Sequence, residues 1–276
     1  MLNYLKNSFR RKIARRFTKE YPTIITHYEF EKDGKIDFAE WTNPLTSLSG
    51  LHQETIDFFR KFIKEGDLVI DIGANIGDTT VPMALAAGKS GLALGFDPNP
   101  YVYKVLAENA KLNTDKLNID PLCYAISVQE EEFFFISSEA SFANGGISPT
   151  KESRHGKFVH TEKIRGVQLM RFLEKNYADW LPKLSFIKVD TEGYDKEILK
   201  SIADLISSHK PIIVAESFGK STDKAKMELF EVITQHGYEV FYFADFDSTA
   251  QIIPIKTKEE IIQWRNTINV YAMPVG

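Results

Sequence analysis

The residues best suited to chemistry form a short glycine-containing segment, IDIGANIGDTT, at residues 70–80. It overlaps the apolar run at 68–72, so the pattern predicts a buried strand, a tight turn and then a helix. Gly73 and Gly77 let the backbone turn sharply and let a ligand approach it closely. A dinucleotide site would read G-x-G-x-x-G here, but Asn75 occupies the place of its second glycine. The segment therefore predicts a small-molecule site of another kind.

Acidic residues around this turn indicate the charge of the ligand. Asp71 ends the first strand, and Asp78 precedes the helix where a pyrophosphate would otherwise meet free N–H groups. Carboxylates there repel phosphate and attract a cation, although Asp78 could also act only as a helix cap. Asp97 closes the next apolar segment and could bind ribose hydroxyls, or simply form a turn before Pro98. A ligand with a sulfonium, an ammonium and a ribose fits these groups, so we predict S-adenosylmethionine.

Lys188, Asp190 and Glu192 form a second group of ionisable residues, on and just after another predicted strand. Alternation places Lys188 and Asp190 on one strand face, opposite Ile187 and Val189. A buried lysine needs a charged partner, for which Asp190 or Glu192 is expected. The acids could take a proton from an acceptor hydroxyl, or the strand end could be a salt bridge that only shapes the pocket. We predict that all three residues form the catalytic group, with Lys188 in the more structural role.

Three segments of the sequence resemble the FkbM-type methyltransferases. They are residues 70–80, FDPNP at 96–100 and FIKVDTEGYDKEILKSI at 186–202, and the resemblance extends in element order from about Ile56 to Met273. It implies a class I methyltransferase fold and transfer of a methyl group to oxygen. The acceptors in that family are often sugar hydroxyls of polysaccharides, glycolipids or macrolides.

The resemblance also implies which residues surround the cofactor. Cofactor contacts would come from the two glycines of the turn, Asn75 and Asp97, while residues 125–127 and 144–146 would lie near cofactor or acceptor. One departure is LMRF at 169–172, where many members carry an Asp pair after the leucine, so no role of those acids is carried over. The predicted cofactor site consists of Asp71, Gly73, Asn75, Gly77, Thr79, Asp97, Asn99, Ala125 and Ile126.

Alternating strands and helices would position these groups. Strands are predicted at 68–73, 92–97, 117–126, 184–190, 211–217, 238–245 and 268–274, with a further strand and a glycine-rich loop at 133–150. Helices are predicted at 51–64, 78–87, 101–113, 167–176, 196–207 and 223–236. This order predicts a doubly wound, mostly parallel, seven-stranded α/β sheet of Rossmann-like, class I methyltransferase type. A helix and a hairpin turning at Asp33-Gly34 would form an extension at 1–50, before a methyltransferase domain at 51–276.

Positive charge is concentrated at the start of the chain. Residues 1–20 carry seven of the 34 Lys and Arg residues and one of the 38 acidic residues, so the remainder has a net charge of −10. An acidic body argues against a nucleic-acid partner, because binding phosphates needs clustered Lys and Arg. The leader also has an apolar helical stripe, which could lie on an anionic membrane or pack on the body, and packing is the preferred interpretation. Its members are Leu2, Leu5, Phe9, Ile13 and Phe17.

Composition excludes several other classes of protein. Cys123 is the single cysteine, which excludes an internal disulfide framework and a Cys-rich zinc site. No apolar run approaches the roughly 20 residues of a membrane span, and charges interrupt the N-terminus, so we expect a cytoplasmic protein. His155, His160, Asp179 and Glu216 have no metal-ligand spacing, so no metal site is predicted.

Two alternatives to an active methyltransferase can be weighed from these motifs. An NAD or nucleotide-sugar enzyme is disfavoured by Asn75 and Asp78. A non-catalytic module that binds S-adenosylmethionine would keep the first loop, but it would be expected to lose the acids after residue 189. The sequence therefore predicts an S-adenosylmethionine-dependent O-methyltransferase for a sugar, glycan or glycolipid hydroxyl, with the binding module as the alternative.

Overall fold

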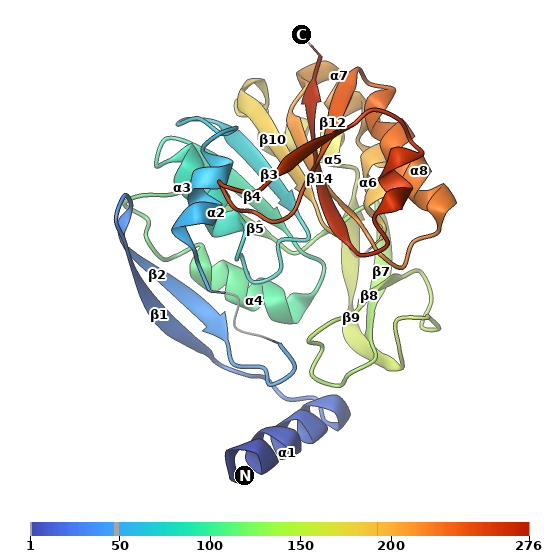
Figure 1. Ribbon diagram of the computed structural model, residues 1–276. Coiled ribbons are helices and arrows are strands. Elements are labelled where there is room, and N and C mark those ends of the chain that lie inside the picture. The colour runs from blue at the N-terminus through green and yellow to red at the C-terminus, as the bar shows by residue number, and fades with distance from the viewer. Residues whose placement is uncertain (1, 47–49, 192, 276) are drawn as a thin grey trace.

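An eight-stranded sheet with helices on both faces forms the centre of the molecule (Figure 1). The computed structural model describes residues 2–46, 50–191 and 193–275, and of residues 2–5 only the backbone. In sheet order the strands are β13 (Ile252–Ile255), β12 (Tyr238–Phe243), β14 (Ile268–Pro274), β11 (Ile212–Ser217), β10 (Leu184–Val189), β3 (Leu68–Ile72), β4 (Leu92–Phe96) and β5 (Ile119–Leu122). The strands from β11 to β5 are parallel, and β14 runs antiparallel between β11 and β12. The mostly parallel α/β sheet is the one that the sequence predicts.

Helices cover the two faces of this sheet, and each face has its own hydrophobic core. One face is covered by α5 (Leu169–Asn176), α6 (Asp195–Ser201), α7 (Ala203–His209) and α8 (Asp223–Thr234). The other face is covered by α2 (Gln53–Phe59), α3 (Thr80–Ala87) and α4 (Pro100–Asn109). Two 3₁₀ turns lie at Leu181–Lys183 and Glu260–Gln263. Ile187 and Val189 of β10 enter the first core and Phe186 the second, so alternation puts Lys188 on the α3 side.

An N-terminal hairpin packs beside α4 and forms a sheet of its own. Its strands are β1 (Thr23–Phe30) and β2 (Gly34–Trp41), so the predicted hairpin is present, but the turn lies at 31–33 and Gly34 pairs with Phe30 as the first residue of β2. Gly34 has φ +64°, the left-handed backbone that glycine adopts without steric cost.

Two asparagine amides attach this hairpin to the end of α4. The side chain of Asn109 exchanges hydrogen bonds of 2.7 and 3.1 Å with the backbone of Ala39. Asn113 does the same with Asp37 at 2.9 and 2.8 Å, so polar groups on the edge of β2 are paired. Since residues of β2 also enter the α2–α4 core, we propose that residues 1–50 are an extension of the domain at 51–276.

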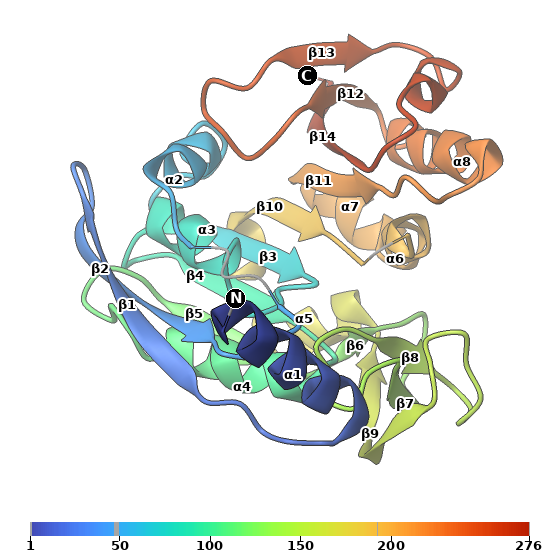
Figure 2. The same cartoon turned by 60° about the horizontal axis from the view of Figure 1, so that its bottom comes forward.

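A smaller, four-stranded sheet lies beside the β5 edge of the main sheet (Figure 2). It consists of β6 (Ala125–Ile126), β9 (Phe158–Val167), β7 (Glu131–Ser137) and β8 (Gly146–Ser148), in that order. The chain enters it directly after β5 and leaves it just before α5. The whole sheet is therefore an insertion between two elements of the main fold.

The helix α1 (Leu2–Arg16) lies outside these layers, below the hairpin and the small sheet in Figure 1. The expectation that its apolar stripe packs on the body is not met: Phe9 is 65% exposed and Phe17 is 64% exposed. Ala14 is the buried residue through which α1 contacts the body, while Ile13 is half-buried. Leu2 and Leu5 belong to the residues whose side chains the structure does not describe. Within the described residues, no helix is long and apolar enough to cross a membrane.

The structure differs from the predicted elements in four places. The strand expected at 117–126 divides into β5 and β6, which belong to different sheets, and the helix expected at 196–207 divides at Ile202 into α6 and α7. Strand β9 was not predicted because its sequence, FVHTEKIRGV, is polar and lacks a period of two. Strand β13, the eighth of the sheet, contains Pro254, which an edge strand tolerates because it needs fewer ladder hydrogen bonds.

Candidate functional site

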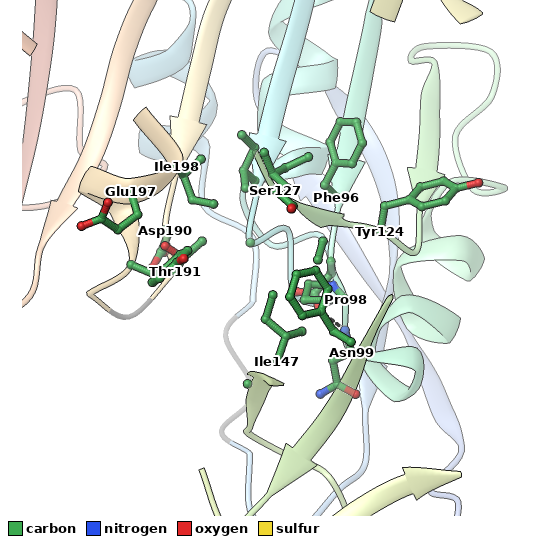
Figure 3. A pocket seen from close by; sticks show the side chains of 18 of the residues that line it. Phe96, Pro98, Asn99, Tyr124, Ser127, Ile147, Asp190, Thr191, Glu197 and Ile198 are labelled. Atoms are coloured by element: carbon green, nitrogen blue, oxygen red, sulfur yellow. Dashed lines mark hydrogen bonds between the residues drawn. The ribbon is translucent and has the colours of Figure 1, made fainter. Parts of the chain in front are cut away.

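A cleft of about 2380 Å³ lies at the edge of the main sheet where β3, β4 and β10 end. The loops after these strands line it, together with residues of β6, β8 and the glycine-rich loop at 143–146. Figure 3 shows Asp190 and Thr191 across the cleft from Pro98, Asn99 and Ile147. The carboxyl ends of parallel strands thus meet the small sheet at one site.

The glycine turn after β3 is shaped by its neighbour β10. Gly73 has φ +84°, and a Cβ built on it would lie 1.9 Å from the carbonyl oxygen of Asp190. The N–H groups of Gly73 and Ala74 also donate to the carbonyl of Phe96, at 2.9 and 3.0 Å. Gly73 is therefore required for the close approach of three strand ends, in addition to any approach of a ligand.

Replacing Gly73 by Ala is expected to destabilise the fold more than a glycine replacement elsewhere. Both the strained φ and the clash with the Asp190 carbonyl contribute. Gly237→Ala is the matched control, because Gly237 has φ +75° but nothing within 4 Å of its Cβ position. Urea denaturation should show a loss at least about 1 kcal/mol larger for Gly73→Ala. Equal losses in the two variants would contradict the close approach.

Asp97 organises the loops after β3 and β4. Its Oδ2 accepts a hydrogen bond from the Asn75 N–H and its Oδ1 accepts one from the Asn99 N–H, both at 2.8 Å. Asn75 has φ +48°, a left-handed conformation that asparagine adopts more readily than most residues, which explains its place in the turn. Burial raises the pKa of Asp97 to about 6, although the two N–H groups oppose the shift. Asp97 lines the cleft, and each of its carboxylate oxygens can accept one further hydrogen bond.

Asp71 and Lys188 form a buried ion pair beneath the cleft. The Lys188 ammonium donates to Asp71 Oδ1 at 3.1 Å and lies 3.3 Å from Asp190 Oδ2. The other oxygen of Asp71 accepts hydrogen bonds from the Thr79 and Thr80 hydroxyls, at 2.8 and 2.7 Å. Lys188 thus has two acidic partners. Asp190 is the predicted one, and Asp71 is the more buried one.

The three carboxylates around Lys188 keep it charged. Burial by itself would lower the pKa of this lysine, but Asp71, Asp190 and Asp78 together raise its pKa. Lys188 is therefore a permanent cation that cannot accept a proton near neutral pH. Its geometry suits holding the Asp190 side chain, whose exposed fraction is 40%.

The loop after β10 is held by Asp195, a residue to which the sequence analysis assigns no role. Its carboxylate accepts hydrogen bonds from the Thr191 hydroxyl and the Gly193 N–H, both at 3.1 Å. It also accepts one from the Glu216 N–H at 3.2 Å, which ties the loop to β11. Burial raises the pKa of Asp195 to about 6. The predicted catalytic residue Glu192 belongs to this loop but lies outside the described residues.

Of the predicted site residues that the structure describes, nine line the cleft and two do not. Asp71 is fully buried with both oxygens bonded inside the protein, and Gly77 is buried against Leu106. Protein atoms already surround both residues, so we propose that they position the turn rather than contact a cofactor directly. The residues that do line the cleft are Gly73, Asn75, Thr79, Asp97, Asn99, Ala125, Ile126, Lys188 and Asp190.

The acidic residues that line the cleft indicate the charge of the ligand that it could bind. Asp78, Asp97 and Asp190 all line it, and Asp78 lies two residues before α3, whose N-cap is Thr79. Burial raises the pKa of Asp78 although Lys188 opposes the shift, so a further cation in the cleft would favour its charged form. These groups suit a cationic ligand with hydroxyl donors better than a pyrophosphate. Within the described residues, no three His, Cys, Asp or Glu side chains are arranged to hold a metal.

Several aromatic side chains also line the cleft, and three of them are residues that the sequence could not place. They are Trp41 from β2, Tyr194 from the loop after β10 and Phe218 from the end of β11. A Cβ on Gly193 would lie 3.1 Å from Phe218, so these two loops are in contact. Tyr194 is 53% exposed, which leaves its ring available to a bound molecule.

Comparison with known proteins places this geometry in a family context. Residues 71–249 match the family described as the methyltransferase FkbM domain. Hexuronic acid methyltransferase AglP of Haloferax volcanii is 28% identical over 162 residues, which make up 59% of this chain and 61% of that protein. The chain thus spans less than two thirds of the length of this curated relative.

Solved structures with similar backbones are more distant. Methyltransferase FkbM from Methylobacillus flagellatus KT is 14% identical with a TM-score of 0.46, and the match covers 76% of this chain and 44% of that one. An S-adenosylmethionine-dependent O-methyltransferase from Thermotoga maritima is 10% identical with a TM-score of 0.43, and the match covers 91% and 78% of the two chains.

Proposed function

The chain belongs to the FkbM methyltransferase family, and on that basis we propose that it transfers a methyl group from S-adenosylmethionine to a hydroxyl of a sugar-containing acceptor. The observation that carries the proposal is the convergence of the glycine turn, Asp97 and Asp190 on one cleft. Asp190 is the partly exposed acid among them, and it is paired with a buried lysine. A module that only bound the cofactor would not need this pair.

Residues at the ends of β3 and β4 would hold the cofactor. Asp97 has lone pairs available for ribose hydroxyls, and Asn75 and Asn99 fix the direction of its carboxylate. Asp78 offers negative charge near the cationic end of the ligand. When bound, S-adenosylmethionine supplies a methyl carbon activated by the adjacent sulfonium.

Asp190 would accept the proton of the acceptor hydroxyl, directly or through a water. Its carboxylate lines the cleft, and Lys188 holds the Oδ2 atom from the buried side. Asp71 in turn holds Lys188, so the base is oriented from the interior. The protein mainly has to align the acceptor oxygen, exclude water and remove one proton.

A sugar is the proposed acceptor class. The curated relative is named for methylation of a hexuronic acid, and aromatic side chains that include Tyr194 and Phe218 line the cleft of this protein. Aromatic rings offer apolar faces to the C–H faces of sugar rings, while their polar edges bind hydroxyls. The acidic body of the chain makes nucleic acid an unfavourable substrate, since phosphates would be repelled over most of the surface.

A methyl-transfer assay with purified protein tests the proposal. Labelled S-adenosylmethionine should give a labelled product with neutral or uronic-acid saccharides and none with RNA, DNA or protein. Methylation of RNA or protein alone would refute the acceptor class. Tight binding of S-adenosylhomocysteine without turnover on any saccharide would favour the non-catalytic binding module instead.

The affinity for S-adenosylhomocysteine is expected to fall as the pH falls through about 6, because Asp97 then becomes protonated. Protonation converts an acceptor of two ribose hydroxyls into a neutral acid, so lowering the pH from about 7.5 to about 5 should weaken binding by up to about tenfold. Isothermal titration across this range measures the effect. Asp97→Asn should bind S-adenosylhomocysteine more weakly, and its affinity should depend less on pH. This result would assign the pH dependence to Asp97 rather than to Asp195, whose pKa is also raised to about 6. A wild-type affinity independent of pH would contradict this role.

The raised pKa of Asp97 also determines how the stability of the folded protein changes with pH. Its pKa in the folded state lies above the ordinary value of 3.8, so protonation favours folding. The stabilisation is complete below about pH 3.8 and is lost as the pH rises through about 6. Asp97→Asn does not reproduce this gain, because the amide has one acceptor oxygen and its NH2 group would face the N–H of Asn75 or of Asn99.

A further inference from the structure

Two phenylalanines of the apolar stripe, one on helix α1 and one directly after it, are left uncovered by the rest of the protein. Phe9 and Phe17 are 65% and 64% exposed. Ile13 lies between them, and steps of four residues keep all three on one side of a helix. Exposed phenylalanines repeated along one helical face are typical of a surface that another apolar phase covers.

Basic side chains surround this stripe. All seven Lys and Arg residues of the leader are exposed, and none of them is within 4.0 Å of a described acidic side chain. They are Lys6, Arg10, Arg11, Lys12, Arg15, Arg16 and Lys19. The rest of the chain has a net charge of −10, so this helix is the strongly cationic part of the protein.

Hydrogen bonds hold α1 in a defined position beside the cleft. The carbonyl of Ala14 accepts from the Ser141 N–H at 2.9 Å, and the Arg11 Nε donates to the Pro44 carbonyl at 3.0 Å. The loop that contains Ser141 also contains Glu139, which lines the cleft. The same loop is tied to the site by Asn99, whose amide donates to the Phe142 carbonyl at 2.9 Å. The helix is thus attached to a wall of the site.

We propose that α1 is a docking surface for an anionic lipid bilayer. Phenylalanines inserted among the acyl chains and Lys and Arg side chains among the headgroups are the two contacts that such a helix makes. Each Lys or Arg near an anionic surface strengthens binding by about fivefold. The acidic body is repelled by the same surface, so the contact is confined to α1 and leaves the cleft free.

Docking would bring the cleft close to the membrane surface, where the sugar of a lipid-linked acceptor could enter it. This consequence rests on the proposed function, whereas docking itself does not. The two are therefore tested separately, the first by turnover and the second by vesicle binding.

The test is cosedimentation of the full chain with vesicles of phosphatidylcholine, with and without phosphatidylglycerol. Binding should require phosphatidylglycerol and weaken with salt. Changing Arg10, Arg11 and Lys12 to Gln should weaken it by about 100-fold, and Phe9→Ser with Phe17→Ser by at least about tenfold. Matched controls are Gln at the exposed Lys89, Lys111 and Lys224, and Ile252→Ser on the β13 edge, all expected to bind like the wild type.

Unchanged affinity for S-adenosylhomocysteine will show that each variant is folded. The proposal is overturned if phosphatidylglycerol does not increase binding, or if the α1 variants bind vesicles as well as the controls do. It is also overturned if the α1 variants instead convert a dimer to a monomer in sedimentation analysis, which would identify a second copy as the occupant. Failure of saccharide methylation would leave this result unaffected.

Discussion

Asp190→Asn is expected to reduce turnover by about 100-fold or more while the affinity for S-adenosylhomocysteine changes little. The amide fits the same space and keeps a contact to Lys188, but it cannot accept the proton of the acceptor hydroxyl. The hydrogen bonds that hold the cofactor loops join Asp97 to the N–H groups of Asn75 and Asn99, and Asp190 takes no part in them. Binding of S-adenosylhomocysteine should therefore persist. Single-turnover rates and titration of S-adenosylhomocysteine measure the two effects separately.

Asp204→Asn is the matched control for this change. Asp204 also lines the cleft, is exposed and undergoes the same loss of charge, but it belongs to α7 and makes no contact with Lys188. It should keep near-normal turnover. Glu192→Gln belongs in the same series, because the sequence assigns the base to either acid. Near-normal turnover of both Asp190→Asn and Glu192→Gln would refute the proposed base.

Lys188→Met should lower the free energy of unfolding by about 3–5 kcal/mol, because it leaves the Asp71 carboxylate buried without its cation. Methionine has a similar length, so packing changes little while the charge is lost. The unfolding midpoint in urea, with an unchanged slope, measures the effect. This is the largest stability change expected of any single substitution proposed for the site.

The double variant Asp71→Asn with Lys188→Met tests that cause. Removing both charges abolishes the unpaired carboxylate, so much of the lost stability should return. Turnover should stay low in the double variant, since Asp190 has lost the group that holds it. Equal destabilisation of the single and double variants would mean that the cost comes from packing rather than charge.

The main sheet could be predicted because its strands are short, buried and apolar. Segments such as LVIDI and LALGF have few alternative conformations that bury them, and the glycine and proline residues between them mark where they end. The small sheet could not be predicted in the same way. Strand β9 pairs with β7 through residues such as Glu132 and Arg165, whose side chains are in solvent, so its pairing depends on tertiary contacts.

The site was predicted where chemistry and backbone conformation coincide. The place of Asn75 in the turn and of Asp97 after a strand follows from residue type and spacing, whereas the left-handed φ of Asn75 is seen only in the structure. The pairing of Lys188 with Asp71 could not be predicted from the sequence. The two residues are 117 positions apart and meet only because β3 and β10 pair in register. For the same reason the role of Asp195 could not be predicted, because its hydrogen bond to β11 forms only in the folded protein.

The small sheet begins and ends at one point of the main domain. Ala125 pairs with Gly166, Ile126 pairs with Val167, and the Ser127 N–H donates to the Val167 carbonyl at 3.0 Å. A segment whose two ends are hydrogen-bonded neighbours can change in length or sequence without moving the core that it leaves. Residues 128–166 therefore have the architecture of an exchangeable cassette, carrying one wall of the cleft while β3 and β4 keep the other. Grafting the corresponding segment of a relative should alter acceptor selectivity and leave cofactor affinity in place.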